Sequence, residues 1–169
     1  MTPMNWPLQS HCDSFYGNPR GHGGHSNPTW EHENLVDFVP PWKMIDEDSK
    51  RPVPHFKMHK KVVDSLTRVF EKIWEFYGKD QSKIEAVHLH IFSGSYVFRP
   101  IRGGTHLSMH AYGVALDLAS SLNELGAPYN PKHGLPMEVI NEFEAEGWVW
   151  GGRWHGRPDA MHFQAAIVG

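Results

Sequence analysis

Two short stretches of this chain carry the residue types that bind a metal ion. The first covers residues 108–118 and contains His110 and Asp117. The second lies near the C-terminus and contains Asp159 and His162. Two imidazoles and one carboxylate leave the fourth position of a tetrahedral zinc ion open for water, and a second carboxylate beside them could activate that water. The pattern therefore indicates a catalytic zinc site.

The residues around Asp117 alternate as in a β-strand. Over 114–119 bulky apolar side chains fall on one face, and two alanines flank Asp117 on the other. Small neighbours leave clearance for a metal and a substrate. Gly113 allows a tight bend that would bring His110 back over Asp117. The spacing alone is also compatible with a capped turn before an ordinary strand, with Asp117 in a salt bridge.

His162 also lies on an expected strand, with Phe163 and Ala165 facing away from it. Asp159 precedes this histidine by three residues, in an expected loop after Pro158. A lone histidine on a strand is more often a hydrogen-bonded core residue than a ligand. Two compact clusters of such residues, each on a face of small or polar neighbours, favour the metal site.

Together these motifs resemble a known family. Ser-x-His-x-x-Gly-x-Ala-x-Asp, Trp-Gly-Gly-x-Trp and Asp-x-x-His-Phe, within residues 92–164, are similar to the zinc peptidases of bacterial cell-wall metabolism. That group includes D-alanyl-D-alanine carboxypeptidases and dipeptidases, and the L-alanyl-D-glutamate peptidases found as phage endolysins. Dipeptidases of the family have Glu where this chain has Asp159. Asp at this position, together with the Trp-Gly-Gly-x-Trp segment, is more similar to the endolysin branch.

The resemblance implies a role for each matching residue. The ligands of one catalytic zinc ion would be His110, Asp117 and His162, and the catalytic carboxylate would be Asp159. It also implies the α+β fold shared by hedgehog proteins and D-alanyl-D-alanine peptidases. The activity implied is that of a hydrolase, specifically a zinc-dependent metallopeptidase.

Further residues are expected to contact the substrate. The family places an arginine upstream to hold the charge that develops on the scissile carbonyl; Arg99 fits this position, and Arg102 is a second candidate. Trp154, the last residue of the Trp-Gly-Gly-x-Trp segment, is another expected substrate contact. Ser108 either hydrogen-bonds the substrate or only caps the turn before His110.

The expected substrate is the stem peptide of peptidoglycan. The endolysin-like features favour an L-alanyl-D-glutamate endopeptidase that degrades the cell wall. One alternative is a D-alanyl-D-alanine carboxypeptidase, which cuts a different bond of the same substrate class. An alternative of another class is a non-catalytic wall-binding module with a structural metal. A structural zinc normally has four protein ligands, so three ligands and a spare carboxylate favour catalysis.

Composition limits the other possibilities. The formal net charge of −3 does not suggest a nucleic-acid surface, and no apolar run approaches the length of a membrane span. Cys12 is the single cysteine, which excludes an internal disulfide. The first residues have neither the basic nor the apolar region of a signal peptide. We expect a monomer made in the cytoplasm that acts at the cell wall after release, as phage lysins do.

The 169 residues predict one α+β domain, with a small and mostly antiparallel sheet packed by helices. Residues 1–56 are rich in Pro, Gly, Asn and His and predict a loop-rich segment that wraps around a catalytic core over 57–169. Hydrophobic periodicity and breaker residues predict the remaining elements. These are a helix over 58–77, a strand over 84–92, a loop over 120–136, a helix over 137–145 and a strand from 148.

Overall fold

A five-stranded sheet forms the centre of the fold in the computed structural model, which describes residues 5–101 and 104–169. The strand order is β2-β4-β5-β7-β6, and every pair is antiparallel except β2 with β4. The α+β class with a mostly antiparallel sheet is therefore confirmed. The strands are β2 (Ile45–Asp46), β4 (Ile91–Gly94), β5 (Ala115–Leu118), β6 (Val149–Trp150) and β7 (His162–Gln164).

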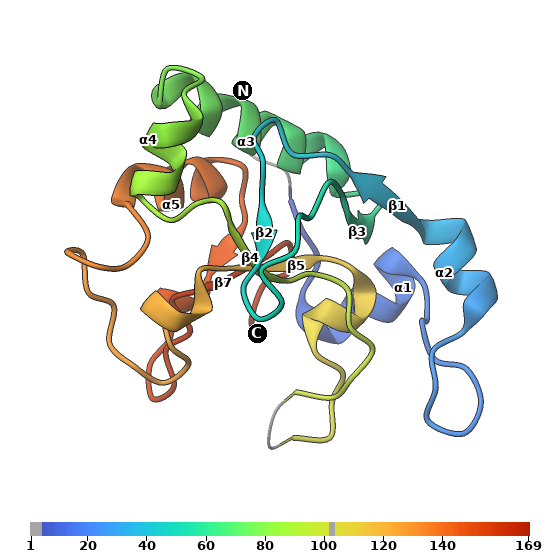
Figure 1. Cartoon of the computed structure of the whole chain (residues 1–169). Helices are drawn as coiled ribbons and strands as arrows, with labels where there is room; N and C mark the ends of the chain where they lie inside the picture. The colour runs from blue at the N-terminus through green and yellow to red at the C-terminus, as the bar shows by residue number, and fades with distance from the viewer. Residues whose placement is uncertain (1–4, 102–103) are drawn as a thin grey trace.

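Helices α3 (Val63–Phe76) and α5 (Met137–Ala145) pack against each other and cover one face of this sheet (Figure 1). Phe163 of β7 stacks on Phe143 of α5, with ring centroids 3.9 Å apart. Side chains alternate along a strand, so the residues on either side of Phe163 point to the opposite face. That face, away from α3 and α5, is where the polar residues of β5 and β7 are directed.

The segment expected to be loop-rich contains short regular elements. They are η1 (Gln9–His11), α1 (Cys12–Tyr16), α2 (Pro28–Asn34), β1 (Leu35–Phe38) and the edge strand β2 of the central sheet, and β1 pairs antiparallel with β3 (Phe56–His59). The start of α2 is encoded locally, because the Asn27 side chain accepts hydrogen bonds from the backbone N–H groups of Thr29 and Trp30.

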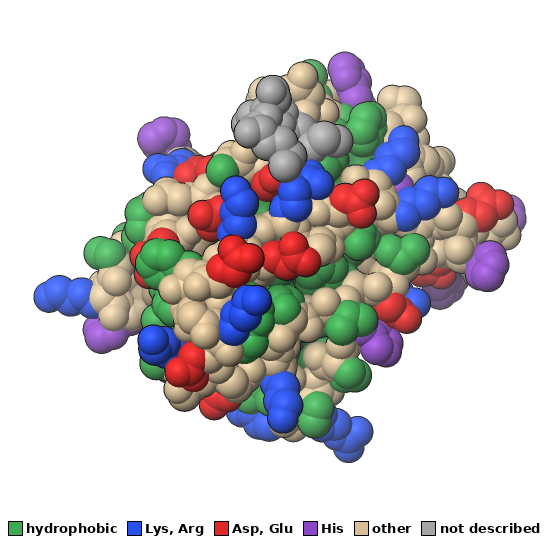
Figure 2. All heavy atoms as spheres, turned by 90° about the horizontal axis from the view of Figure 1, so that it is seen from above, with side chains coloured by type: hydrophobic (Ala, Val, Ile, Leu, Met, Phe, Trp, Pro, Cys, Tyr) green, Lys and Arg blue, Asp and Glu red, His purple; other side chains and the backbone are tan. Residues whose placement is uncertain are grey.

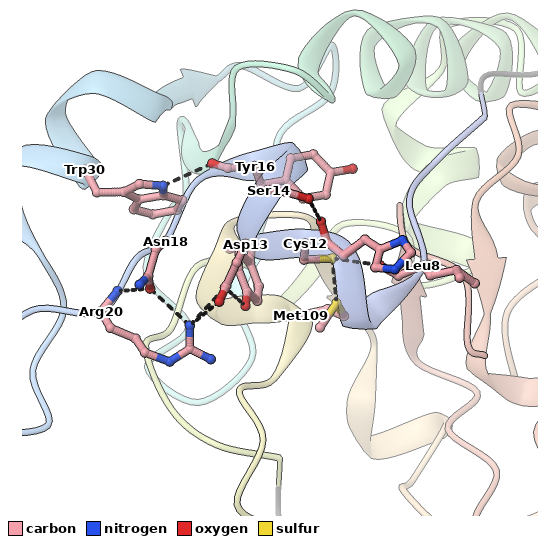
Figure 3. Close-up of polar contacts among 11 residues, drawn as sticks. Leu8, Cys12, Asp13, Ser14, Tyr16, Asn18, Arg20, Trp30 and Met109 are labelled. Carbon is pink, nitrogen blue, oxygen red and sulfur yellow. Dashed lines mark hydrogen bonds and ion pairs between the residues drawn. The ribbon is translucent and has the colours of Figure 1, made fainter.

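Side chains of this N-terminal segment hold it against the rest of the chain. The Trp30 indole donates to the Tyr16 carbonyl at 3.0 Å, and the Cys12 sulfur lies 3.7 Å from that of Met109 (Figure 3). The Tyr16 hydroxyl donates to the carbonyl of Ala165, just after β7, at 2.7 Å. The segment thus contacts both stretches that carry the candidate ligands.

The structure corrects two sequence-based predictions. The helix expected over 58–77 begins only at Val63, because the preceding residues Phe56–His59 pair with β1. The strand expected over 84–92 is mostly wrong: α4 occupies Gln81–Ala86, and β4 begins at Ile91. Asp80 caps α4 by accepting from the backbone N–H of Ser82 at 2.9 Å, a local signal stronger than the apolar alternation that follows.

The other expected elements agree more closely with the structure. The helix over 137–145 is confirmed, and the loop over 120–136 contains only the short 3-10 turn η3 (Ser120–Leu122). The strand expected from 148 is β6. None of the helices in residues 5–101 and 104–169 is long and apolar enough to cross a membrane. Across the face seen from above in Figure 2, acidic and basic side chains are intermingled, so neighbouring charges offset one another.

His59 is a buried histidine, and both of its ring nitrogens form hydrogen bonds. Nδ1 accepts from the Lys61 N–H at 3.0 Å, and Nε2 donates to the Tyr16 carbonyl at 2.9 Å. Burial lowers the pKa of His59 to about 4 from 6.5, although the hydrogen bond to Tyr16 works in the opposite direction. Because the folded-state pKa is depressed, the folded state resists protonation that the unfolded chain accepts. The contribution of the neutral His59 ring to the free energy of unfolding is complete above pH 6.5 and is lost as the pH falls toward 4.

We therefore expect His59→Phe to flatten the acid dependence of stability. Between about pH 7 and about pH 4.5, protonation of His59 in the unfolded state should cost the wild-type protein about 2–3 kcal/mol more than the variant. Urea denaturation at both pH values measures this difference. His133, which is exposed, supplies a control. On going from the higher to the lower pH, His133→Phe should lose as much stability as the wild type does. An equal loss in wild type and His59→Phe would contradict the assignment.

Candidate metal centre

The register of two neighbouring strands sets the core of the candidate site. Asp117 of β5 lies directly opposite His162 of β7, and Leu116 lies opposite Phe163. Since Phe163 faces α5, Asp117 and His162 both point to the other face of the sheet. The strand alternation predicted for both stretches is confirmed over β5 and β7.

The third residue, His110, lies in the 3-10 turn η2 (Met109–Tyr112), which shortly precedes β5. Gly113 ends this turn in the left-handed region, at φ 70°, and a Cβ there would come within 2.6 Å of Leu35 and 3.0 Å of the His59 backbone nitrogen. Glycine is thus required for the bend that returns His110 over Asp117. The bend expected at Gly113 is present.

His110, Asp117 and His162 converge on one point. His110 Nε2 lies 3.1 Å from Asp117 Oδ2, and His162 Nδ1 lies 2.9 Å from Asp117 Oδ1. One ligand atom from each residue falls within 4.8 Å of the other two. The exposed fractions of the three side chains are only 4%, 13% and 7% in the same order. Two imidazole nitrogens and a carboxylate oxygen are a donor set that zinc accepts.

The far nitrogen of each imidazole has a carbonyl partner. His110 Nδ1 lies 2.6 Å from the Ser95 backbone oxygen, and His162 Nε2 lies 2.9 Å from the Gln164 amide oxygen. A carbonyl oxygen only accepts, so the far nitrogens carry hydrogen. In neutral rings the near nitrogens then direct lone pairs at the Asp117 carboxylate. That arrangement requires either extra protons or a cation between the groups, and the ligand cluster therefore fits a divalent metal.

The charges in the cluster shift the pKa values of its members. Burial by itself would raise the pKa of Asp117, but hydrogen bonds and charges from His110 and His162 hold it well below its usual range. For His162 burial acts to lower the pKa, and the Asp117 hydrogen bond and the charges of Asp117 and Asp159 raise it above the ordinary value. The carboxylate is therefore anionic and attracts positive charge to this point.

Asp159 lies beside the cluster without joining it. Its Oδ2 atom is 4.0 Å from His162 Nδ1, and its Oδ1 atom is buried with no hydrogen-bond partner among the described residues. Burial raises the pKa of Asp159, and the negative charge of Asp117 adds to that effect, while His162, His110 and Arg157 oppose it. A carboxyl group with a raised pKa and a free oxygen is suited to accept and return a proton.

The Trp-Gly-Gly segment explains the position of Asp159. The Asp159 N–H donates to the carbonyl of Gly151 at 2.8 Å. A Cβ on Gly151 would lie 2.5 Å from the Asp159 backbone oxygen and 2.9 Å from its Cβ. The absence of a side chain at Gly151 is therefore what lets the loop bring Asp159 next to His162.

The cluster opens into a cavity of about 720 Å³. Arg99, Ser108 and Trp154, three of the expected substrate contacts, line this cavity, and Arg102 lies outside the described residues. Ser108 is nearly buried and caps η2 by accepting from the His110 N–H at 3.2 Å, so its capping role is confirmed. The Trp154 ring lies 5.5 Å from that of His162. Substrate contact by these residues stays a prediction.

Several cavity residues were not singled out from the sequence. Gln164 contacts His162 directly, and Gln9 and Arg157 also line the cavity. A signal for Gln164 exists, because it lies two residues after His162 on the same strand face. Gln9 is far from the motifs in sequence and lies in a turn, so no local pattern marks it.

Comparison with known proteins finds one family model that matches the part of the chain containing these residues. Residues 102–165 match a family model described as D-alanyl-D-alanine carboxypeptidase. The match covers rather more than a third of the chain and includes all four of His110, Asp117, Asp159 and His162. It confirms the resemblance to the zinc peptidase family and supports a peptidase that acts on peptidoglycan. No curated protein and no solved structure gives a significant match.

The contact between Gly151 and Asp159 leads to a prediction. Gly151→Ala should lower the free energy of unfolding by about 1–3 kcal/mol, because the new methyl group must push backbone atoms apart. Denaturant unfolding measures this loss. Gly104, whose φ is likewise outside the left-handed region and where a Cβ would meet no atom closer than 3.5 Å, provides the control for a Gly→Ala change without a close approach. Equal losses in Gly151→Ala and Gly104→Ala would show that the close approach is unimportant.

Proposed function

We propose that this protein is a zinc-dependent peptidase that hydrolyses peptidoglycan stem peptides, as an L-alanyl-D-glutamate endopeptidase of the endolysin type. The observation that carries the proposal is the convergence of His110, Asp117 and His162 on one cavity, with Asp159 beside them. Three ligands leave a coordination position for a reactant, and the uncommitted carboxylate supplies proton transfer.

The two histidines and Asp117 would hold the metal. A zinc ion bound there supplies a Lewis acid that polarises a carbonyl and lowers the pKa of water toward neutrality. The Ser95 carbonyl holds the His110 ring, so that Nε2 faces the ligand point. The buried walls around the cluster exclude bulk water and strengthen each of these electrostatic interactions.

Asp159 is the proposed proton carrier. It takes a proton from the attacking water as the new carbon–oxygen bond forms at the scissile carbonyl. It then gives that proton to the leaving amine as the carbon–nitrogen bond breaks, so one water is consumed per peptide bond. The raised pKa of Asp159 brings its two protonation states closer in energy at neutral pH, which both transfers need.

Arg99 is the proposed donor to the developing negative charge on the carbonyl oxygen. It lines the same cavity, and its guanidinium Nη1 atom donates to the Pro100 carbonyl at 3.2 Å. Loss of such a donor typically costs about 100- to 1000-fold in rate.

The proposal includes a place of action. Peptidoglycan lies outside the cytoplasmic membrane, so the protein would reach it after release from the cell that makes it, as in phage lysis. It would act there as a monomer on the exposed stem peptides.

One second candidate function has an observation in its favour. The description of the matching family model names a D-alanyl-D-alanine carboxypeptidase, which removes the terminal residue of the same stem peptide. A non-catalytic wall-binding module with a structural metal would need neither the cavity nor a buried carboxylate oxygen that has no hydrogen-bond partner among the described residues, and both are present.

Metal binding and catalysis should separate between two variants. We expect His110→Ala to lose both zinc and peptidase activity, because one of three ligands is gone. Asp159→Ala should keep zinc and lose activity, because the ligands remain and the proton carrier does not. Elemental analysis and a peptidase assay on the purified proteins test this. Turnover by Asp159→Ala within a few-fold of wild type would contradict the role of Asp159.

The bond cleaved is decided by digesting purified peptidoglycan. We expect new L-alanine carboxyl ends and new D-glutamate amino ends, identified by mass spectrometry. Release of free D-alanine without these ends would support the carboxypeptidase instead. Binding to peptidoglycan with no released peptide from the zinc-loaded protein would support the wall-binding module.

A further inference from the structure

We propose that Gln164 is a positioning residue that fixes the tautomer of His162, and that Gln9 of the N-terminal segment holds Gln164 in place. The inference rests on the proposed metal site and concerns the geometry of one ligand. His162 and Gln164 are both nearly buried, with 6% and 2% of their surfaces exposed. Their contact is therefore shielded from competing water.

The direction of the Gln164 amide follows from its other neighbours. Its Nε2 atom lies 2.9 Å from the backbone oxygen of Ala166 and 2.6 Å from the side-chain oxygen of Gln9. The Ala166 carbonyl can only accept a hydrogen bond, so the NH2 group of Gln164 must face it. The amide oxygen then faces His162 Nε2 at 2.9 Å.

The amide direction determines where the imidazole proton lies. Because the Gln164 oxygen accepts, His162 Nε2 must donate and therefore carries hydrogen. A neutral imidazole has one N–H, so Nδ1 presents its lone pair. That nitrogen lies 2.9 Å from Asp117 Oδ1, inside the ligand cluster. The Ala166 carbonyl thus selects, through Gln164, the ring form of His162 that can bind a metal.

Gln9 extends this chain of contacts to the N-terminal segment. Its backbone N–H donates to the Ile167 carbonyl at 2.8 Å, just beyond β7, and Leu8 forms a bridge with Ile167. Helix α1 follows η1 directly, and Figure 3 shows that its first residue, Cys12, contacts Met109 of η2. Gln9 lies outside the matched residues 102–165, so this contact involves a part of the protein that the family model does not cover.

The two ligand histidines differ in a way that permits a test. The ring of His110 is held by the backbone carbonyl of Ser95, which no substitution removes, whereas the ring of His162 is held by a side chain. Removal of a partner hydrogen-bonded to a metal ligand typically weakens metal affinity by about 10–100-fold. Gln164 should show that effect, because it is the acceptor for His162.

The experiment measures zinc affinity by competition with a chelator. Gln164→Leu should bind zinc about 10–100-fold more weakly than wild type, because the His162 ring then lacks its acceptor. Asn123→Leu is the matched control. It removes another buried amide, one that contacts Ala119 and Leu135, and should leave zinc affinity unchanged. Folded Gln164→Leu with wild-type zinc affinity, or an equal loss in Asn123→Leu, overturns the proposal.

A second measurement needs neither a variant nor a metal. Long-range proton–nitrogen NMR of the metal-free wild-type protein, at a pH at which the His162 ring carries one proton, should place that proton on Nε2. A proton on Nδ1 overturns the proposal, even if Gln164→Leu does not fold. Failure of the proposed function would give another result. The protein would bind zinc and Gln164→Leu would weaken that binding, but no peptide bond would be cut.

Discussion

The pairing of β5 with β7 is the constraint on which the rest of the site depends. It sets Asp117 opposite His162 on the face of the sheet away from α5. A slip of β7 by one residue would turn His162 toward the core and Phe163 toward the cavity. The stacking of Phe163 on Phe143 opposes that slip, because it would take this aromatic ring out of the core. Packing on one face of the sheet thereby maintains the chemistry on the other.

A buried carboxylate between two imidazoles is costly unless positive charge joins it. Backbone and amide carbonyls commit the far nitrogens of His110 and His162, so both near nitrogens are directed at Asp117. The cost of that arrangement in the absence of protons or metal is a physical reason for a cation to bind. Asp159 contributes negative charge to this cluster but no hydrogen bond, since the close approach at Gly151 sets it near His162 but beyond hydrogen-bond distance.

The N-terminal segment contributes to a site whose motifs all lie in the second half of the chain. Tyr16 donates to the carbonyl of Ala165, and Gln9 accepts from the Gln164 side chain. These contacts flank β7 beyond His162 and limit the motion of its end. A segment rich in loop-forming residues is thus ordered by a few long-range hydrogen bonds and buried aromatic rings, among them Trp30, Phe38 and Trp42.

The sequence by itself determined what local periodicity and residue chemistry encode. The alternation around Asp117 and His162 gave the correct strands, the apolar spacing from Met137 gave α5, and the residue types indicated the ligand set. Only the tertiary structure decided that Phe56–His59 pair with β1 instead of extending α3, and that Gln9 reaches Gln164. The physical reason is distance along the chain. Pairing of remote segments depends on which surfaces meet on folding, and no window of neighbouring residues contains that information.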